Sequence, residues 1–476
     1  MLPKNLAYGS KVESASARSY RTNIQPQNGT GNYNAGDTII INIPTRNNLV
    51  YVPCESYLKF THTVTSGAAD SNYARFDSCG AHGLIQRVRV FHGSNLLSDI
   101  DNYGLLSKVL FDLQVPTDSS YGKYNVIAGT RSDLTCTIPT LVASDLSGGT
   151  FSNFTLPVTQ TNSGLRLNAT AKMTANGTVA NGGVISQTFC LNLITLAGAL
   201  CKDKYFPLFA CTSAPLRVEI QLVPALINGM CIHTASTFQI TNCEYIAQMI
   251  ELSDSAMNII RESQNGQPLQ FVNPDYRNYQ YTFALANGAS TQVSMPIPAK
   301  FSSLKSLFIT VRDSGNVPKL TYFPYSSNKF GIASYFFRVG SQILPSKVPD
   351  TLPEMFSECV KAIGSMGDLN HQPSIDFTSY TQDAPVANAG DISVAFGTAY
   401  YATSAISSGS FYVGLDLENY SNSDKAAIFS GWNSNTDDIY FMGSFTAPSA
   451  ITARFDAFAL FDTVLVFENG TAYVKY

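Results

Sequence analysis

Few residues of this sequence have the types and spacing that chemistry requires. Neither a His-Glu-x-x-His run nor a Cys/His cluster with zinc spacing occurs. The sequence also lacks the Gly-x-Ser-x-Gly elbow of serine hydrolases and the Gly-Lys-Ser/Thr loop that holds phosphates. The five histidines stand apart from one another: His62, His82, His92, His233 and His371. We therefore predict no catalytic, cofactor-binding or metal-binding residues and no enzymatic activity.

One loop offers a candidate contact for a sugar or for calcium. Asp437 and Asp438 lie shortly after Trp432, the only tryptophan of the chain. Acidic residues beside one aromatic ring also make an ordinary solvated loop, so a structural role is the alternative. For His62 and His92, which lie on predicted strands, we likewise expect structural roles.

Charge is scarce in this chain. Charged residues make up 13% of it, about half of the usual share of roughly 25%. Because a soluble monomer normally has more surface charge, we expect much of the outside to be polar and uncharged, or buried against other subunits. The 25 tyrosines and 29 phenylalanines point the same way, since aromatic residues favour strands and protein interfaces.

The formal net charge of −4 argues against nucleic acid as the main partner. The N-terminus is a local exception, because it contains four basic residues and one acidic residue, Glu13. The basic residues are Lys4, Lys11, Arg18 and Arg21. This segment is either a docking arm or a disordered polar leader.

The nine cysteines predict reduced thiols. Their number is odd, no Cys-x-x-Cys pair occurs, and eight of them lie before residue 253. This pattern suits buried thiols and folding in a reducing compartment better than a secreted disulfide framework. We also expect no signal peptide, because Met1-Leu-Pro-Lys-Asn5 leads into polar sequence.

The two halves of the chain share a faint repeat. Thr63-Val64 and Thr310-Val311 both end strand-like runs, and Gly93-Ser-Asn-Leu-Leu97 is matched by Gly340-Ser-Gln-Ile-Leu344, both pairs at an offset of 247. A helical apolar pattern also recurs at an offset of 250: Leu105, Leu106, Val109, Leu110 and Leu113, then Met355, Phe356, Cys359, Val360 and Ile363. Three matches in one order predict a duplicated domain. The alternative is two unrelated β-domains that each use glycine turns and one amphipathic helix.

Strand-like segments dominate both halves, and each half has one good helix. In the first half the strands are expected at 38–44, 49–53, 57–64, 84–92, 189–193, 204–210, 216–222 and 243–252, with a helix from Asp101 or Asn102 to about Leu113. In the second half they are expected at 279–285, 292–298, 411–417, 455–461 and 463–467, and a hairpin at Asn469-Gly470 leads to the last strand. This composition predicts sandwiches or jelly rolls rather than βαβ units.

The length of 476 residues favours two domains. We predict an N-terminal arm at 1–30, a first jelly roll at 31–252, a linker at 253–269 and a second jelly roll at 270–476. Residues 141–186 are rich in Ser, Thr, Asn and Gly, which predicts a long exposed excursion.

These features together resemble a known family, the double jelly-roll major capsid proteins of tailless membrane-containing bacteriophages, adenoviruses, virophages and large algal viruses. Ile85-Gln-Arg-Val-Arg-Val-Phe-His-Gly93 leads to a helix, and Tyr205-Phe-Pro-Leu208 precedes Leu216-Arg-Val-Glu-Ile-Gln-Leu222, which is similar to the family's end-of-barrel segment. Phe455-Asp-Ala-Phe-Ala-Leu-Phe-Asp462 runs into Val464-Leu-Val-Phe-Glu-Asn-Gly470, which is similar to its closing strands. The resemblance covers nearly the whole chain and rests on element order.

The resemblance implies an all-β chain of two tandem eight-stranded jelly-roll β-barrels with short helices in the connections. It implies a major capsid protein that forms homotrimers, which act as pseudo-hexameric capsomers and tile an icosahedral virion shell assembled in the host cell. Residues 141–186 would contribute to an outer tower. The arm before residue 30 would lie inside and contact neighbouring capsomers, penton and minor capsid proteins, or an internal membrane.

Two other functions remain open from the residues alone. A glycan-binding adhesin or receptor-binding spike would also use exposed Tyr, Asn and Asp, although it would need neither two similar halves nor reduced thiols. A two-domain jelly-roll enzyme acting on glycosides would be favoured by several exposed tryptophans and acids, and this chain has one tryptophan.

Overall fold

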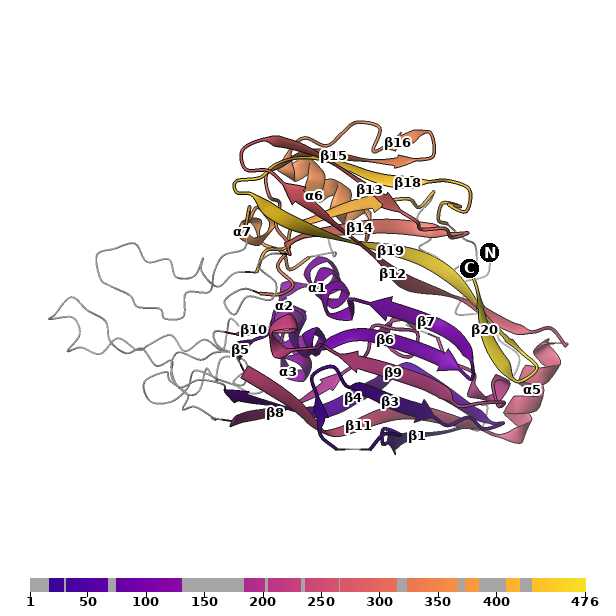
Figure 1. Ribbon diagram of the computed structural model, residues 1–476. Helices are drawn as coiled ribbons and strands as arrows, with labels where there is room; N and C mark the ends of the chain where they lie inside the picture. The colour runs from indigo at the N-terminus through magenta and orange to yellow at the C-terminus, as the bar shows by residue number, and fades with distance from the viewer. Residues whose placement is uncertain are drawn as a thin grey trace, which may run out of the picture.

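The computed structural model describes most of the chain: residues 17–29, 31–66, 74–130, 184–201, 204–232, 236–264, 266–314, 323–364, 366–367, 373–384, 408–419 and 430–476. Figure 1 shows two β-sandwiches, one above the other, whose long strands run in roughly the same direction. The first half of the chain forms the lower sandwich and the second half forms the upper one.

The first sandwich is made of two antiparallel sheets. The sheet β1-β11-β4-β8 contains Ala17–Ile24, Ser236–Leu252, Leu49–Ser66 and Val184–Leu191, and the short β2 (Tyr33–Asn34) also pairs with β11. The facing sheet β3-β9-β6-β7 contains Thr38–Ile43, Leu216–Leu222, Ile85–His92 and Asn95–Asp101. Burial alternates along β3 and β9, because every second side chain of a strand points to the same face of its sheet.

The second sandwich repeats this design. Its sheet β12-β19-β14-β17 contains Leu269–Leu285, Ile451–Glu468, Leu304–Asp313 and Tyr412–Asp416, with β20 (Thr471–Lys475) paired to β19. The facing sheet β13-β18-β15-β16 contains Ser290–Ile297, Ile439–Thr446, Ile332–Val339 and Gln342–Leu344. Its core is rich in aromatic rings, among them Phe441, Phe445 and Phe455.

Both sandwiches have the same strand order. Counting the eight main strands of each half along the chain, one sheet has the order first, eighth, third, sixth and the other has second, seventh, fourth, fifth. This is the connectivity of a jelly roll. The predicted fold class, two tandem eight-stranded jelly rolls, is therefore confirmed.

The sequence repeat falls on equivalent positions. Thr63-Val64 lies on the third strand of its sandwich, β4, and Thr310-Val311 lies on the third strand of the other, β14. Gly93 and Gly340 form the turns between the fourth and fifth strands, with φ of 58° and 57°. Glycine adopts this left-handed conformation without the strain that a Cβ atom would add.

Helices follow the fifth strand in both halves. α1 (Tyr103–Gln114), α2 (Thr117–Tyr121) and α3 (Lys123–Ala128) come after β7, whereas α6 (Leu352–Lys361) and α7 (Phe377–Tyr380) come after β16. α5 (Asp254–Gln264) lies between the sandwiches in the chain, inside the predicted linker. Shorter elements are a pair of strands, β5 (Ala74–Arg75) and β10 (Cys231–Ile232), and 3₁₀ turns at Gly80–Leu84, Ala199–Cys201, Leu208–Ala210 and Leu226–Asn228.

Several predicted boundaries differ from the structure. Residues 17–24 of the predicted arm form β1, which pairs with β11 along its whole length. Its residues are exposed or half-buried, so they lack the apolar alternation that marks an inner strand. The segment 204–210 is not a strand: it makes one bridge, between Phe206 and Tyr51, and then a 3₁₀ turn.

Two pairs of predicted strands are single long strands. Residues 49–53 and 57–64 are both parts of β4, and its pairing with β11 shifts register twice. A β-bulge of this kind lets a strand continue through an irregularity such as Pro53. Residues 455–461 and 463–467 are both parts of β19. Of the predicted excursion, residues 141–183 lie outside the described part of the chain, and 184–186 begin β8.

Candidate functional site

The described histidines are packed into cores. His62 is fully buried among the rings of Phe76, Phe189 and Phe238, with ring centroids 5.7–6.4 Å away. Neither of its ring nitrogens has a hydrogen-bond partner. Burial lowers the pKa of His62 to about 3, because an imidazolium would be unsolvated there. His62 is therefore a neutral core residue.

The other described histidines are tied to specific partners. His82 Nδ1 lies 2.9 Å from the hydroxyl of Tyr103, and burial lowers its pKa to about 3. The backbone N–H of Ala472 donates to His92 Nδ1 at 3.1 Å, so Nε2 carries the proton and donates to the carbonyls of Cys211 and Ala214. His233 and His371 lie outside the described residues.

The loop with Trp432 is held by its own side chains. The indole N–H of Trp432 donates to Asp437 Oδ2 at 2.8 Å, and Lys300 Nζ lies 2.9 Å from Asp438 Oδ1. Both acidic residues therefore bind donors of this protein. Within the described part of the chain, no group of three or more His, Cys, Asp or Glu side chains could hold a metal ion.

The described cysteines with placed side chains are all free thiols, and Cys54 alone among them is exposed. Burial raises the pKa of Cys201, Cys211, Cys243 and Cys359 to about 12. These thiols stay protonated at neutral pH, which makes them poor nucleophiles and poor metal ligands.

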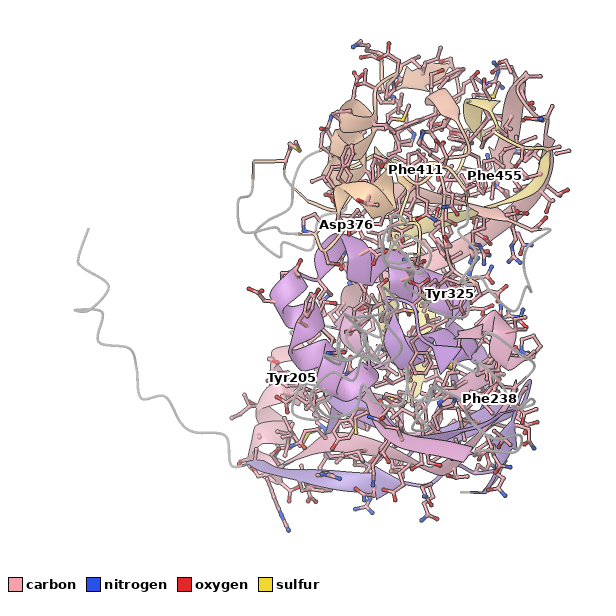
Figure 2. All side chains as sticks on the ribbon, turned by 90° about the vertical axis from the view of Figure 1, so that its left-hand side faces the viewer. Tyr205, Phe238, Tyr325, Asp376, Phe411 and Phe455 are labelled. Carbon is pink, nitrogen blue, oxygen red and sulfur yellow. The ribbon has the colours of Figure 1, made fainter. Side chains whose placement is uncertain are left out.

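Polar contacts connect the two sandwiches along the join between them, and α1 lies in this join toward the end that also holds α2, α3 and α7 (Figure 1). Tyr103–Leu113 of α1 are all buried. Tyr325 from the second half packs on α1 where Gly104 leaves room, since a Cβ at Gly104 would lie 2.4 Å from the Tyr325 hydroxyl. That hydroxyl donates to the Gly83 carbonyl at 2.8 Å. Figure 2 places Tyr325 between Phe238 of the first sandwich and Phe411 and Phe455 of the second.

A buried charge cluster fixes α1 to the second sandwich. Lys108 Nζ lies 3.1 Å from Asp77 Oδ1 and 2.9 Å from Asp112 Oδ2, and all three side chains are nearly inaccessible to solvent. Tyr412 and Ser410, from the second half, donate to Asp112 Oδ2 at 2.6 and 2.8 Å. Burial alone would lower the pKa of Lys108, but the two carboxylates raise it above its ordinary value, so the lysine is charged.

A second cluster joins the start of α1 to β19. Asn102, in the left-handed region with φ of 49°, donates from Nδ2 to Asp456 Oδ1 at 3.0 Å. Asn tolerates this conformation better than most residues. Arg312 holds the other oxygen of Asp456 with two donors, Nε at 3.1 Å and a terminal nitrogen at 2.5 Å. Asp456 is completely buried, so these donors take the place of water around its side chain.

The far end of the join is formed by β12, β19 and β20. β12 and β20 pack against β7 of the first sandwich, and Leu465 and Phe467 of β19 belong to the core of the first sandwich. Phe467 meets Phe206 edge-to-face at 5.3 Å. Ser98 donates to Asp275 Oδ1 at 2.9 Å, across the join. The apolar core of the first sandwich thus extends into the join, where it includes Phe308, Tyr325 and Phe458 of the second half, while the second sandwich keeps a separate core of its own.

Asp275 makes the join sensitive to pH. Burial raises the pKa of Asp275 to about 7, although the Tyr276 N–H and the Ser98 hydroxyl donate hydrogen bonds that favour the charged carboxylate. Because the folded pKa lies above the unfolded one, this group favours folding below about pH 4, and its contribution is lost as the pH rises through 7. Asp275→Asn is therefore expected to stabilise the protein at pH 8, by at most about 4 kcal/mol, and to change little at pH 4. Denaturant unfolding of both proteins at the two pH values measures the difference, and an equal effect at both would contradict this role.

The outer surface carries several large apolar side chains. Phe377 is 82% exposed at the start of α7, next to Asp376, and Tyr205 is 61% exposed on another part of the surface (Figure 2). Val126, Met366 and Ile259 are also more than half exposed. Among the described helices, none is long and apolar enough to span a membrane.

Comparison with known proteins finds similarity in structure and none in sequence. No family model and no curated protein matches the chain. The PBCV-1 virus capsid matches with a TM-score of 0.56 at 11% identity over 99% of each chain. The Sputnik virophage structure matches with a TM-score of 0.56 at 11% identity, over 100% of this chain and 92% of that one.

The mavirus major capsid protein matches with a TM-score of 0.53 at 12% identity, over 100% of this chain and 95% of that one. The alignments extend across both sandwiches and the join between them, since they cover nearly the whole of each chain. This protein therefore has the double jelly-roll fold of viral major capsid structures, and the resemblance inferred from its sequence is confirmed at the level of the fold.

Proposed function

We propose that this protein is the major capsid protein of an icosahedral virus, located in the virion shell. The proposal rests on the pair of jelly rolls, which have the same strand order and are joined by buried charges. The similarity to viral capsid structures extends over nearly the full length of both chains. The role is structural, without catalysis.

Three copies would form one capsomer. Each chain supplies two similar sandwiches, so a trimer has six and presents a nearly hexagonal outline that can tile a shell. This use requires a fixed angle between the two sandwiches. The Lys108 and Asp456 clusters supply that rigidity, because buried charges tolerate little displacement from their partners. Scarce charge and exposed side chains such as Phe377 suit subunit interfaces.

The ends of the molecule suggest its orientation. α1–α3 and α7, which follow the fifth strand of each sandwich, lie at one end, and α5 lies at the other (Figure 1). We place the first end outward. The α5 end would face inward, where the N-terminal segment could contact neighbouring capsomers, penton and minor capsid proteins, or an internal membrane.

A glycan-binding spike is less well supported. In its best candidate, the loop of Trp432, Asp437 and Asp438, the Trp432 N–H binds Asp437 and Lys300 pairs with Asp438, so both aspartates already have partners within this protein.

The purified protein is expected to be a trimer with a hexagonal outline. Size-exclusion chromatography with light scattering should give a mass of about 155 kDa, three times the 51.5 kDa of one chain, and negative-stain electron microscopy should show hexagonal blocks or closed shells. A persistent monomer across a range of protein concentrations and salt would contradict the proposal.

A further inference from the structure

The outer face of the sheet β13-β18-β15-β16 carries a patch of large side chains. Burial alternates along β15 and β18, and Phe337 and Phe441 point into the core. Their neighbours Phe336 and Met442, which are register partners, therefore point outward and are half-buried. A second row of register partners runs beside them across all four strands. We call these two rows the β15 patch: Pro296, Phe336, Arg338, Ile343, Tyr440 and Met442. Aromatic rings, methionine and arginine are the residue types enriched at protein interfaces.

The equivalent positions of the first sandwich are charged and paired. Arg89 lies 247 residues before Phe336, and its register partner Glu219 corresponds to Met442. Arg89 and Glu219 form an ion pair at 2.9 Å. Phe336 and Met442 gain free energy when they leave water, whereas a partly exposed ion pair is well solvated and gains little. The second sandwich alone therefore has an outer face here that favours being covered.

The join indicates what covers this face. In the join, the side of the first sandwich that carries β7 and α1 packs against the sheet β12-β19-β14-β17 of the second. Figure 1 shows the four sheets one above another, with β1-β11-β4-β8 at one end of the stack and β13-β18-β15-β16 at the other. Repeating the step of the join from the second sandwich therefore places β13-β18-β15-β16 on the sheet β1-β11-β4-β8 of another copy. A head-to-tail interface of this kind closes into a ring when its rotation permits.

The receiving sheet has an outer face of hydroxyl groups. Thr61 corresponds, at the offset of 247, to Phe308, which is buried in the join. The hydroxyls of Thr61 and Thr188 lie 3.1 Å apart, and those of Thr63 and Ser186 lie 2.7 Å apart on the same face. Because these hydroxyls are already hydrogen-bonded to one another, covering them costs less than covering unpaired hydroxyls. These four residues are called the hydroxyl face below.

We propose that the β15 patch of one copy of this chain packs against the hydroxyl face of the next copy, so that the copies associate head to tail. This inference rests on the trimer proposed above and adds the two surfaces that meet in it. The two halves of the chain then have different tasks: the first sandwich presents the hydroxyl face, and the second presents the patch.

Two variants of the full chain test the pairing by light scattering. Phe336→Glu/Met442→Glu damages the β15 patch, and Thr61→Glu/Ser186→Glu damages the hydroxyl face. Each should weaken self-association at least about 100-fold, because a charge covered without a partner is costly at an interface. A 1:1 mixture of the two variants should form a heterodimer of about 103 kDa, twice the 51.5 kDa of one chain, since each variant keeps the surface that the other has lost. Glutamate at both surfaces keeps the damaged surfaces from attracting each other.

Phe91→Glu is the matched control, because Phe91 is half-buried on the equivalent strand of the first sandwich, outside both proposed surfaces. It should form trimers like the native protein. Circular dichroism shows whether the variants are folded, and Phe336→Ser/Met442→Ser, which adds no charge, should also weaken association.

The outcomes separate this inference from the proposed function. If the native protein and both double glutamate variants form trimers, or if the mixture stays monomeric, the pairing of these two surfaces is overturned while the trimer stands. Dissociation of Phe91→Glu to the same extent would also overturn it. A native protein that stays monomeric overturns both the pairing and the proposed trimer.

Discussion

Replacing Lys108 by methionine is expected to lower the free energy of unfolding by about 3–5 kcal/mol, the range seen when one partner of a buried ion pair is removed. The ammonium group is the shared counter-charge of Asp77 and Asp112, and side-chain exposure at all three is 6% or less. Methionine fills much of the same volume but leaves two buried carboxylates facing each other. Because Asp112 also accepts bonds from Ser410 and Tyr412, the angle between the sandwiches should loosen as well.

Guanidinium unfolding followed by circular dichroism measures this loss. The matched control is Lys347→Met, because Lys347 pairs with Glu354 at 3.2 Å while its side chain is 78% exposed. Exposed pairs of this kind contribute about 0–1 kcal/mol. The triple variant Lys108→Met/Asp77→Asn/Asp112→Asn should recover part of the loss, since it leaves no charge unpaired. Equal effects of the two lysine substitutions would refute a special role for the cluster.

Acidification is expected to destabilise the first sandwich through His62. Its folded pKa of about 3 lies below the ordinary 6.5, so the stability that depends on neutral His62 is complete above pH 6.5 and is lost progressively as the pH falls toward 3. At pH 4 the loss from this one residue is about 3 kcal/mol. His62→Leu removes the titrating group and its two unpaired nitrogens.

When the pH is lowered from 7.5 to 4, the free energy of unfolding of the native protein should therefore fall by about 3 kcal/mol more than that of His62→Leu. Other titrating groups, such as His82, are present in both proteins and cancel in this difference. Unfolding at each pH gives the values. A difference that does not change with pH would show that His62 is accessible to water or is protonated without cost.

Inner strands could be predicted from the sequence because their signal is local. The alternation in β9 places Leu216, Val218 and Ile220 on one face, and the structure buries all three. The edge strand β1 could not be predicted because none of its residues is fully buried, so its sequence carries no such pattern. β4 was divided in two because Pro53 normally ends a strand, whereas here the bulged pairing with β11 continues past it.

The join could not be predicted, although one signal for it was present. Lys108 and Asp112 are spaced i, i+4 on a helix that is otherwise almost entirely apolar. A helix that is apolar on all sides is buried, so these two charges needed buried partners. Nothing local indicates that the partners are Asp77 and Tyr412, because they belong to distant parts of the chain.

The sequence by itself determined the repeated order of elements. Alternating strands, the glycine turns at Gly93 and Gly340, and a helix with an apolar face after each fifth strand depend on residues that are close in the chain. The turns and the helix recur in both halves, at offsets of 247 and 250. The tertiary structure alone decided how the two halves meet. Buried charges such as Lys108 and Asp456 are tolerated only where charged and polar groups pair with them. Part of that pairing comes from the other half, from Ser410 to Lys108 and from Asn102 to Asp456, and the fold brings these groups together across hundreds of residues.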